Sequence, residues 1–103
     1  MRVKLLAVGR LKRGGGEIDL AARYHERFDA AGRQIGLGPL TQVELSESKA
    51  GDVAARRDDE AERLLGRAET AGRRIVLDEG GKSLSSAAFA KLIGNLRDDG
   101  VAE

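Results

Sequence analysis

The order of apolar and polar residues along the chain predicts alternating strands and helices. Residues 3–8 are apolar apart from Lys4, which is typical of a strand buried in a sheet. Over residues 17–31 the apolar side chains recur on one side of a helix, and Gly32 provides a left-handed stop for it. Residues 40–45 alternate imperfectly between apolar and polar, which favours a second strand.

The next stretch predicts a second helix and then a third strand. Asp52 is placed to cap a helix whose first half is rich in acids, as the helix dipole favours, and Gly72 ends this helix. Ile75, Val76 and Leu77 form a short apolar run, closed by a carboxylate and two glycines. This pattern predicts a buried central strand that leaves the sheet in a tight turn.

The last predicted helix follows this turn. Ser85 or Ser86 supplies a hydroxyl that accepts a hydrogen bond from the free N–H groups at its start. Gly100 lies where such a helix would terminate. The apolar positions follow the spacing of one helical face: Phe89, Leu92, Ile93 and Leu96.

The whole pattern predicts an α/β fold in one domain over residues 1–103. The order β-α-β-α-β-α implies a parallel sheet with flanking helices and right-handed crossovers. Such sheets bind ligands at the carboxyl ends of their strands, so the turn after Leu77 is the first place to expect a ligand. Three strands make a narrow sheet, and one more strand is expected after Gly100.

Composition and charge narrow the class of protein. Hydrophobic residues make up 41% and charged residues 34% of the chain, which is typical of a soluble globular domain. A formal net charge of +1 gives no overall field that would steer the chain to nucleic acid or to an anionic membrane. The absence of cysteine excludes disulfides and thiolate metal sites and favours the reducing cytoplasm. We expect no metal site and no membrane span, because no His, Asp and Glu cluster has ligand spacing and no apolar run approaches about 20 residues.

Three short motifs have ordinary explanations. Residues 81–83 (Gly-Lys-Ser) imitate the end of a phosphate-binding P-loop, but the position of its first glycine is Val76, inside the predicted strand. The glycines at 14–16 resemble part of a dinucleotide fingerprint, but Asp19 stands where the third glycine belongs and would repel a pyrophosphate. His25, the single histidine, is expected to be solvated or hydrogen-bonded rather than a catalytic base.

The first thirteen residues carry basic side chains and no acid. Arg10, Lys12 and Arg13 follow the first strand and are candidates for an RNA-binding edge, since contacts to phosphates position a nucleic acid without reading its sequence. The alternative is a solvated loop. The basic residues of this stretch are Arg2, Lys4, Arg10, Lys12 and Arg13.

Two carboxylates end the predicted central strand. Asp78 and Glu79 could hydrogen-bond a ribose or an amino group of a ligand. Equally, Asp78 could only fix the turn through an Asx-type hydrogen bond to backbone N–H. The residues by themselves leave both roles open.

Several stretches of the chain resemble one known family. Residues 77–90 match the pattern LDExGKxLSSxxFA of the RlmH (YbeA-like) family, which belongs to the SPOUT-class methyltransferases. Residues 6–12 are similar to that family's first strand and basic turn, and Tyr24, Arg27 and Phe28 resemble its YxxRF pattern. The match covers nearly all of the chain.

The resemblance implies a homodimeric enzyme with a trefoil-knotted α/β fold. Members of the family transfer a methyl group from S-adenosylmethionine (SAM) to N3 of a pseudouridine in 23S, large-subunit ribosomal RNA. The resemblance also implies that Leu77 lines the cofactor pocket, and its neighbours Asp78 and Glu79 are candidates by adjacency. No residue of the sequence stands out as the catalytic base.

Family members continue beyond the segment that this chain matches. That further part holds the family's glycine loop, the knot, most of the cofactor cradle, the dimer interface and the catalytic tail. We therefore expect the N-terminal part of a SPOUT fold with the knot missing. The alternative is a catalytically inactive, truncated α/β module that binds no cofactor of its own.

Overall fold

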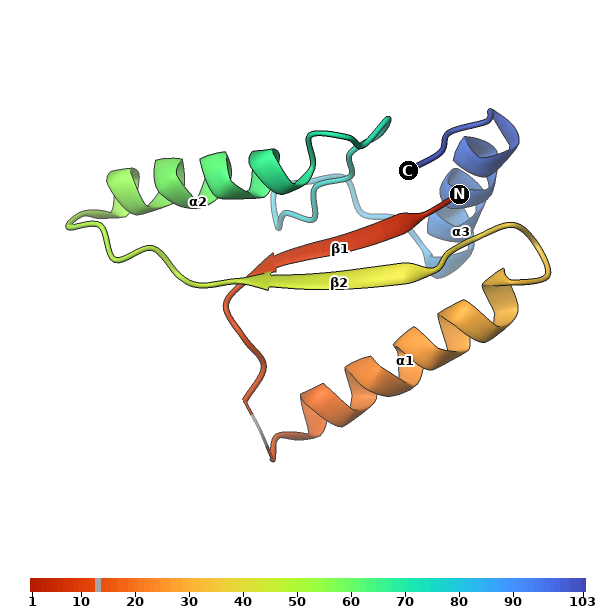
Figure 1. Cartoon of the computed structure of the whole chain (residues 1–103), viewed down its shortest axis with the longest axis horizontal. Helices are drawn as coiled ribbons and strands as arrows, with labels where there is room; N and C mark the ends of the chain where they lie inside the picture. The colour runs from red at the N-terminus through yellow and green to blue at the C-terminus, as the bar shows by residue number, and fades with distance from the viewer. Residues whose placement is uncertain (13) are drawn as a thin grey trace.

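The computed structural model describes residues 1–12 and 14–103, and this part contains two strands and three helices (Figure 1). The strands predicted at 3–8 and 40–45 are confirmed, and so are all three helices. No helix in this part of the chain is long and apolar enough to cross a membrane. The elements are β1 (Val3–Val8), α1 (Gly16–Gly32), β2 (Leu40–Leu45), α2 (Val53–Arg67) and α3 (Ser86–Asp98).

The two strands form a parallel sheet, with α1 and α2 on opposite sides of it (Figure 1). The register runs from Val3 opposite Leu40 to Val8 opposite Leu45. The connection between the strands passes through α1, because parallel neighbours need a long crossover. The predicted α/β architecture with a parallel sheet and flanking helices is therefore confirmed.

Side-chain caps start two of the helices. Asp52 Oδ1 accepts a hydrogen bond from the N–H of Ala55 at 2.7 Å, and Ser85 Oγ accepts one from the N–H of Ala88 at 3.1 Å. Because the first N–H groups of a helix have no partner within it, these caps fix where α2 and α3 begin. Gly100, with a φ of +82°, follows the end of α3 as predicted.

The ends of the first two helices differ in detail from the prediction. Gly32 is the last residue of α1, but it is not left-handed. It is buried, and a Cβ at this position would collide with the carbonyl oxygen of Leu37, so close approach is what requires glycine here. The left-handed residues of this turn are Gly36 and Gly38, with φ angles of +73° and +94°. α2 ends at Arg67, earlier than predicted.

The predicted third strand over residues 75–77 is wrong, because the structure has a loop there. The last two residues of this run are 83% and 79% exposed. Apolar and β-branched residues favour a strand only where a neighbouring strand covers them and takes their backbone hydrogen bonds. Just before the run, the N–H groups of Gly72 and Arg73 donate to the main-chain oxygen of Glu103, at 2.9 and 3.4 Å. The order in the described part of the chain is therefore β-α-β-α-α.

The last three residues follow Gly100, after which the sequence predicts a further strand. They lie along the edge of β1 that faces away from β2. The N–H of Arg2 donates to the carbonyl oxygen of Ala102 at 2.8 Å. The hydroxyl of Thr70 donates to the Glu103 carboxylate at 2.8 Å, and Lys4 Nζ lies 3.2 Å from it. These contacts, with the hydrogen bond from Thr70 first, lower the pKa of Glu103 below its ordinary value of 4.5. Both chain termini therefore lie at the same end of the sheet (Figure 1).

The elements are arranged openly around the sheet. The radius of gyration is 15.2 Å, against about 13 Å expected for a compact domain of this length. The accessible surface is 8188 Å², against about 5,600 Å² expected for a folded monomer of this size. Among residues 1–12 and 14–103, no hydrophobic side chain is buried. Apolar faces of α1 and α3 therefore line open hollows instead of a sealed core.

Candidate functional site

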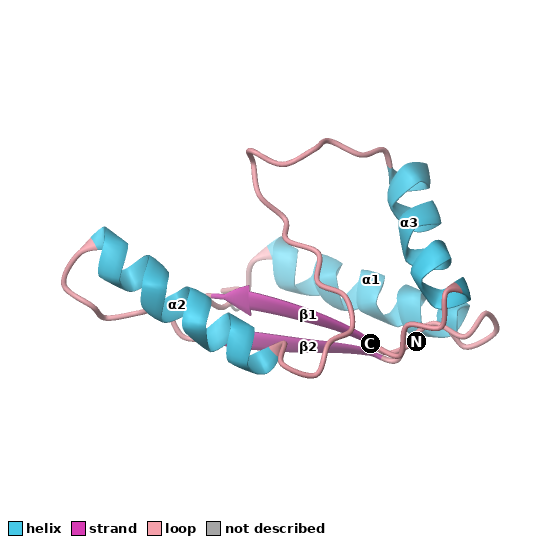
Figure 2. Ribbon diagram, turned by 90° about the horizontal axis from the view of Figure 1, so that it is seen from above, coloured by secondary structure: helices cyan, strands magenta, loops and turns pink. Residues whose placement is uncertain are grey.

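The helix α3 and the loop that leads into it border an open hollow of about 750 Å³, which we call the α3 hollow. α3 stands at the end of the sheet near both termini, and the loop arches away from the sheet before joining it (Figure 2). The walls are mainly apolar and include Phe89 and Ile93 of α3, Val76 and Leu77 of the loop, and Ile35 after α1. The volume lies within the range of roughly 300–1,000 Å³ that is usual for ligand sites.

Two apolar stretches of the sequence build this hollow. Phe89 and Ile93 belong to the predicted apolar face of the last helix and are four residues apart, so they lie one above the other. Residues 75–77 enter no sheet in the described part of the chain, and all three line the hollow instead. Leu77 is 79% exposed. A ligand that covers it would gain about 2 kcal/mol from burial of apolar surface.

The three residues predicted to bind the cofactor lie close together, but only Leu77 lines the α3 hollow. Asp78 Oδ2 accepts a hydrogen bond from the N–H of Gly80 at 3.3 Å, and its carbonyl oxygen accepts one from the N–H of Gly81 at 2.9 Å. This is the Asx-type turn that the sequence offered as one role for Asp78. Glu79 is exposed beside it.

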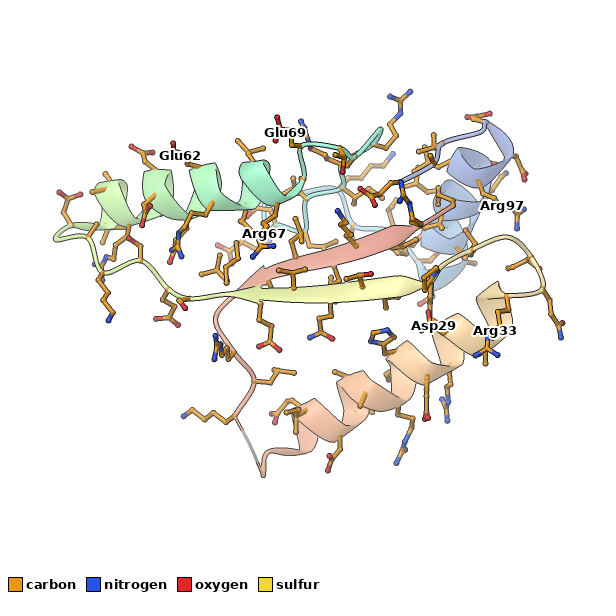
Figure 3. The ribbon with its side chains drawn as sticks, viewed as in Figure 1. Asp29, Arg33, Glu62, Arg67, Glu69 and Arg97 are labelled. Carbon is orange, nitrogen blue, oxygen red and sulfur yellow. The ribbon has the colours of Figure 1, made fainter. Side chains whose placement is uncertain are left out.

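Arg97 is a residue of this site that sequence reasoning missed. It lines the hollow from α3, and its Nη1 donates to the carbonyl oxygen of Ile35 at 3.1 Å (Figure 3). Its Nε donates to the Asp98 carboxylate at 3.0 Å. Arg97 thereby joins α3 to the turn after α1, 62 residues away in the chain. No local pattern could have identified this contact.

The residues predicted to bind RNA lie elsewhere. Arg10 and Lys12 are exposed in the loop after β1, and Arg13 lies outside the described residues. The N–H of Leu11 donates to Glu44 Oε2 at 3.2 Å, which holds this loop against β2. The loop leaves the sheet at the carboxyl ends of the strands, whereas α3 lies near their amino ends (Figure 1). The structure therefore does not bring the two predicted sites together.

A second cavity, of about 880 Å³, lies between α1 and the sheet. Leu5 and Ala7 of β1 form part of its wall, with Tyr24 and Phe28 of α1 opposite. Arg10 also lines this cavity, which connects it with the basic loop. The cavity extends along the sheet from Leu40, the first residue of β2, to Arg10 after β1. It therefore reaches the carboxyl ends of the strands, where α/β sheets commonly bind ligands.

His25 is hydrogen-bonded, as predicted, and forms a clasp with Asp29 around the first residue of β2. His25 Nε2 lies 2.7 Å from the carbonyl oxygen of Leu40 and 3.4 Å from Asp29 Oδ2. Asp29 Oδ1 accepts a hydrogen bond from the N–H of Leu40 at 2.8 Å. No group of three His, Asp or Glu side chains in the described residues is placed to hold a metal ion. Through its two contacts with Leu40, the clasp fixes α1 against β2.

The fold and sequence define the class of protein to which the chain belongs. A family model described as "Predicted SPOUT methyltransferase" matches residues 1–103, so the chain belongs to the SPOUT methyltransferase family. The resemblance seen in the signature at residues 77–90 is thereby confirmed. No solved structure is significantly similar to the chain.

The names of curated relatives specify the kind of methyltransferase that each of them is. The chain is 48% identical over 103 residues to the "Ribosomal RNA large subunit methyltransferase H" of Rhizobium johnstonii. The matched region covers 100% of the chain and 64% of that protein. It is 46% identical over 101 residues to the protein of the same name from Rhodopseudomonas palustris, and the matched region covers 98% of the chain and 62% of the relative. The protein of that name from Bradyrhizobium diazoefficiens is 45% identical over 101 residues, with the same coverage. The chain therefore spans less than two thirds of the length of these relatives.

Proposed function

We propose that this protein is an SAM-dependent methyltransferase that acts on N3 of a pseudouridine in 23S, large-subunit ribosomal RNA. Membership of the family supports the methyltransferase class, and the names of the relatives support ribosomal RNA as the substrate. SAM as the cofactor and N3 as the target follow from the RlmH-like signature at residues 77–90. With ribosomal RNA and the ribosome as partners, the protein would work in the cytoplasm.

The α3 hollow fits the cofactor in size and character. A hollow of about 750 Å³ can hold an adenosyl group, and its apolar wall includes the aromatic ring of Phe89. The single observation that carries the proposal is that Leu77, the residue matched to the family's cofactor pocket, is open to this hollow. Asp78 and Glu79 follow it in the chain and stay candidates for hydrogen bonds to the ribose or the amino group.

The protein contributes to the reaction mainly by positioning the target base against the cofactor. Bound SAM supplies a methyl group on a positively charged sulfur. Holding N3 of the target base in line with that methyl group replaces a bimolecular encounter by a step within one complex. N3 must also lose its proton, which a nearby basic group would favour. We assign no residue to this base.

We propose that Arg10, Lys12 and Arg13 contact phosphates of the RNA. Their position in a loop at the carboxyl ends of the strands supports this role, and Arg10 and Lys12 are exposed. Reversal of the charge at these positions should weaken binding of a ribosomal RNA fragment and lower its salt dependence by about one unit of slope for each phosphate that is no longer neutralised. Reversal at Lys91, an exposed cation of α3, is the control. Unchanged affinity and slope would mean that the loop is merely solvated.

We also propose that the protein works as the homodimer of its family. The open arrangement supports this, since large apolar side chains such as Leu20 and Tyr24 of α1 are 49% and 58% exposed. Monomeric proteins rarely leave broad apolar patches in contact with water. Light scattering after gel filtration measures the mass directly, and a monomer at all concentrations would show that residues 1–103 do not dimerise through these apolar side chains.

The cofactor proposal is tested by titration of the ¹⁵N-labelled chain with SAM, followed by the backbone amide signals. We expect weak, saturable binding with shifts at residues 75–77 and in the first turns of α3. Leu77→Asp should weaken binding about tenfold, equivalent to about 1.4 kcal/mol of apolar burial. Leu65→Asp is the matched control, because Leu65 is 56% exposed on α2 and lies outside the hollow.

Two results would decide against the proposal. If the chain binds no SAM, the alternative of an inactive α/β module without cofactor binding holds. If SAM binds and the Leu77 and Leu65 variants weaken it equally, the α3 hollow is the wrong site.

A further inference from the structure

Lys82 is a charged side chain of the α3 hollow that has no partner in the described part of the chain. Two cations line the hollow, Lys82 and Arg97. The guanidinium of Arg97 is committed to the carbonyl oxygen of Ile35 and to the carboxylate of Asp98. Lys82 is exposed and makes no hydrogen bond or ion pair with residues 1–12 or 14–103. Its ammonium group is therefore free to bind a ligand.

The walls of the hollow offer this ammonium group no counter-charge. Among the described residues that line the hollow there is no Asp or Glu. Glu79, the nearest acid along the chain to Lys82, is exposed and forms no ion pair with it, and Asp78 accepts the hydrogen bond from the N–H of Gly80 within its own turn. In an apolar hollow, an uncompensated cation favours a ligand that brings a negative group, because a charge-assisted hydrogen bond then replaces the hydration that the cation gives up. The hollow thus suits a ligand with an apolar body and one anionic group.

We propose that Lys82 binds the carboxylate of SAM, an inference that rests on the proposed function. SAM combines an uncharged adenosyl body with a methionyl carboxylate, an amine and a sulfonium. The amine and the sulfonium are cations, so Lys82 repels them, and the carboxylate is the one charged group that it attracts. Lys82 therefore determines which end of the cofactor lies at the glycine turn of residues 80–82. Leu77 and Phe89 are left to contact the adenosyl group.

The test compares SAM with decarboxylated SAM, which keeps the adenosyl group, the sulfonium and the amine but lacks the carboxylate. Both are titrated into the ¹⁵N-labelled chain. We expect the chain to bind SAM about fivefold to tenfold more tightly, which is the usual effect of one charge-assisted hydrogen bond at a partly exposed site. The readout is a ratio of affinities, so it does not depend on methyl transfer.

Three variants assign the preference to Lys82. Lys82→Met keeps the approximate length of the side chain and removes the charge. The ratio of its affinities for SAM and decarboxylated SAM should therefore fall to about one, because binding of SAM weakens and binding of decarboxylated SAM does not. Lys82→Arg keeps the charge and should retain most of the preference. Lys91→Met removes an exposed cation of α3 that does not line the hollow, and its ratio should equal that of the unmodified chain.

The possible failures are distinct. If SAM binds and the Lys82→Met chain keeps the full preference for it, the inference is wrong and the proposed function stands. If Lys82→Met weakens binding of a ribosomal RNA fragment while the preference for SAM persists, Lys82 belongs to the RNA-binding surface and the inference is overturned. If the unmodified chain binds neither compound, both the cofactor proposal and the role of Lys82 fail.

Discussion

The clasp between α1 and β2 gives the sharpest test of the fold, through the substitution Asp29→Ala. Asp29, labelled in Figure 3, accepts a hydrogen bond at Oδ1 from the N–H of Leu40 at 2.8 Å. Its Oδ2 lies 3.4 Å from His25 Nε2. Removal of the carboxylate leaves the first N–H of β2 without its acceptor and removes the contact of Asp29 with the His25 imidazole. The hydrogen bond from Leu40 joins β2 to α1, whereas the contact with His25 lies within α1 and holds the imidazole beside the carbonyl oxygen of Leu40. The substitution should therefore loosen α1 from the sheet.

The magnitude follows from the contacts of the carboxylate. Hydrogen bonds to charged groups contribute about 1.5–3 kcal/mol, and the lower part of this range applies because the Asp29 side chain is 30% exposed. The contact with the His25 imidazole, itself 31% exposed, adds less than about 1 kcal/mol. Alanine returns about 0.5 kcal/mol through its higher helix propensity. We therefore expect the free energy of unfolding to fall by about 1.5 kcal/mol.

Urea unfolding followed by far-UV circular dichroism measures this loss. The midpoint should fall by about 1 M with an unchanged slope. Glu26→Ala, an exposed acid of the same helix, is the control and should change stability by less than about 0.5 kcal/mol. If Asp29→Ala is as stable as Glu26→Ala, the clasp does not hold α1 in place.

Four further predictions test other contacts. Because the folded-state pKa of Glu103 is lowered, its contacts stabilise the fold above the ordinary pKa of 4.5 and lose this effect as the pH falls through the lowered value. The difference in stability between the unmodified chain and Glu103→Gln should therefore close on acidification. A difference that is constant with pH would refute this stabilisation by the charged carboxylate. Thr70→Val removes the hydroxyl that donates to the Glu103 carboxylate and should lower the stability at neutral pH, whereas unchanged stability would contradict this contact. Ser85→Ala should cost about 1 kcal/mol and speed hydrogen exchange in the first turn of α3, and unchanged exchange there would count against the cap. Gly32→Ala should cost more than about 2 kcal/mol, because its Cβ meets the carbonyl oxygen of Leu37; a variant with the original urea midpoint would contradict this close approach.

The sequence by itself determined the elements whose signals are local. Apolar spacing and capping residues predicted the bounds of β1 and β2, the cap Asp52 and the parallel order of the sheet. They also predicted a serine cap for α3, although the choice of Ser85 over Ser86 came from the structure. The family signature over residues 77–90 likewise depends on the order of residues alone. Such features need only neighbours within a few positions, so the primary structure contains them in full.

Only the tertiary structure decided what depends on segments far apart in the chain. Residues 75–77 carry the pattern of a strand, yet a strand also needs a neighbour to take its backbone hydrogen bonds, and the described part of the chain provides none along this run. Arg97 meets Ile35, and Glu103 meets Thr70, through contacts that no local spacing encodes. The α3 hollow has the same origin: its walls come from three separate segments, and its existence is a property of how they meet rather than of any one of them.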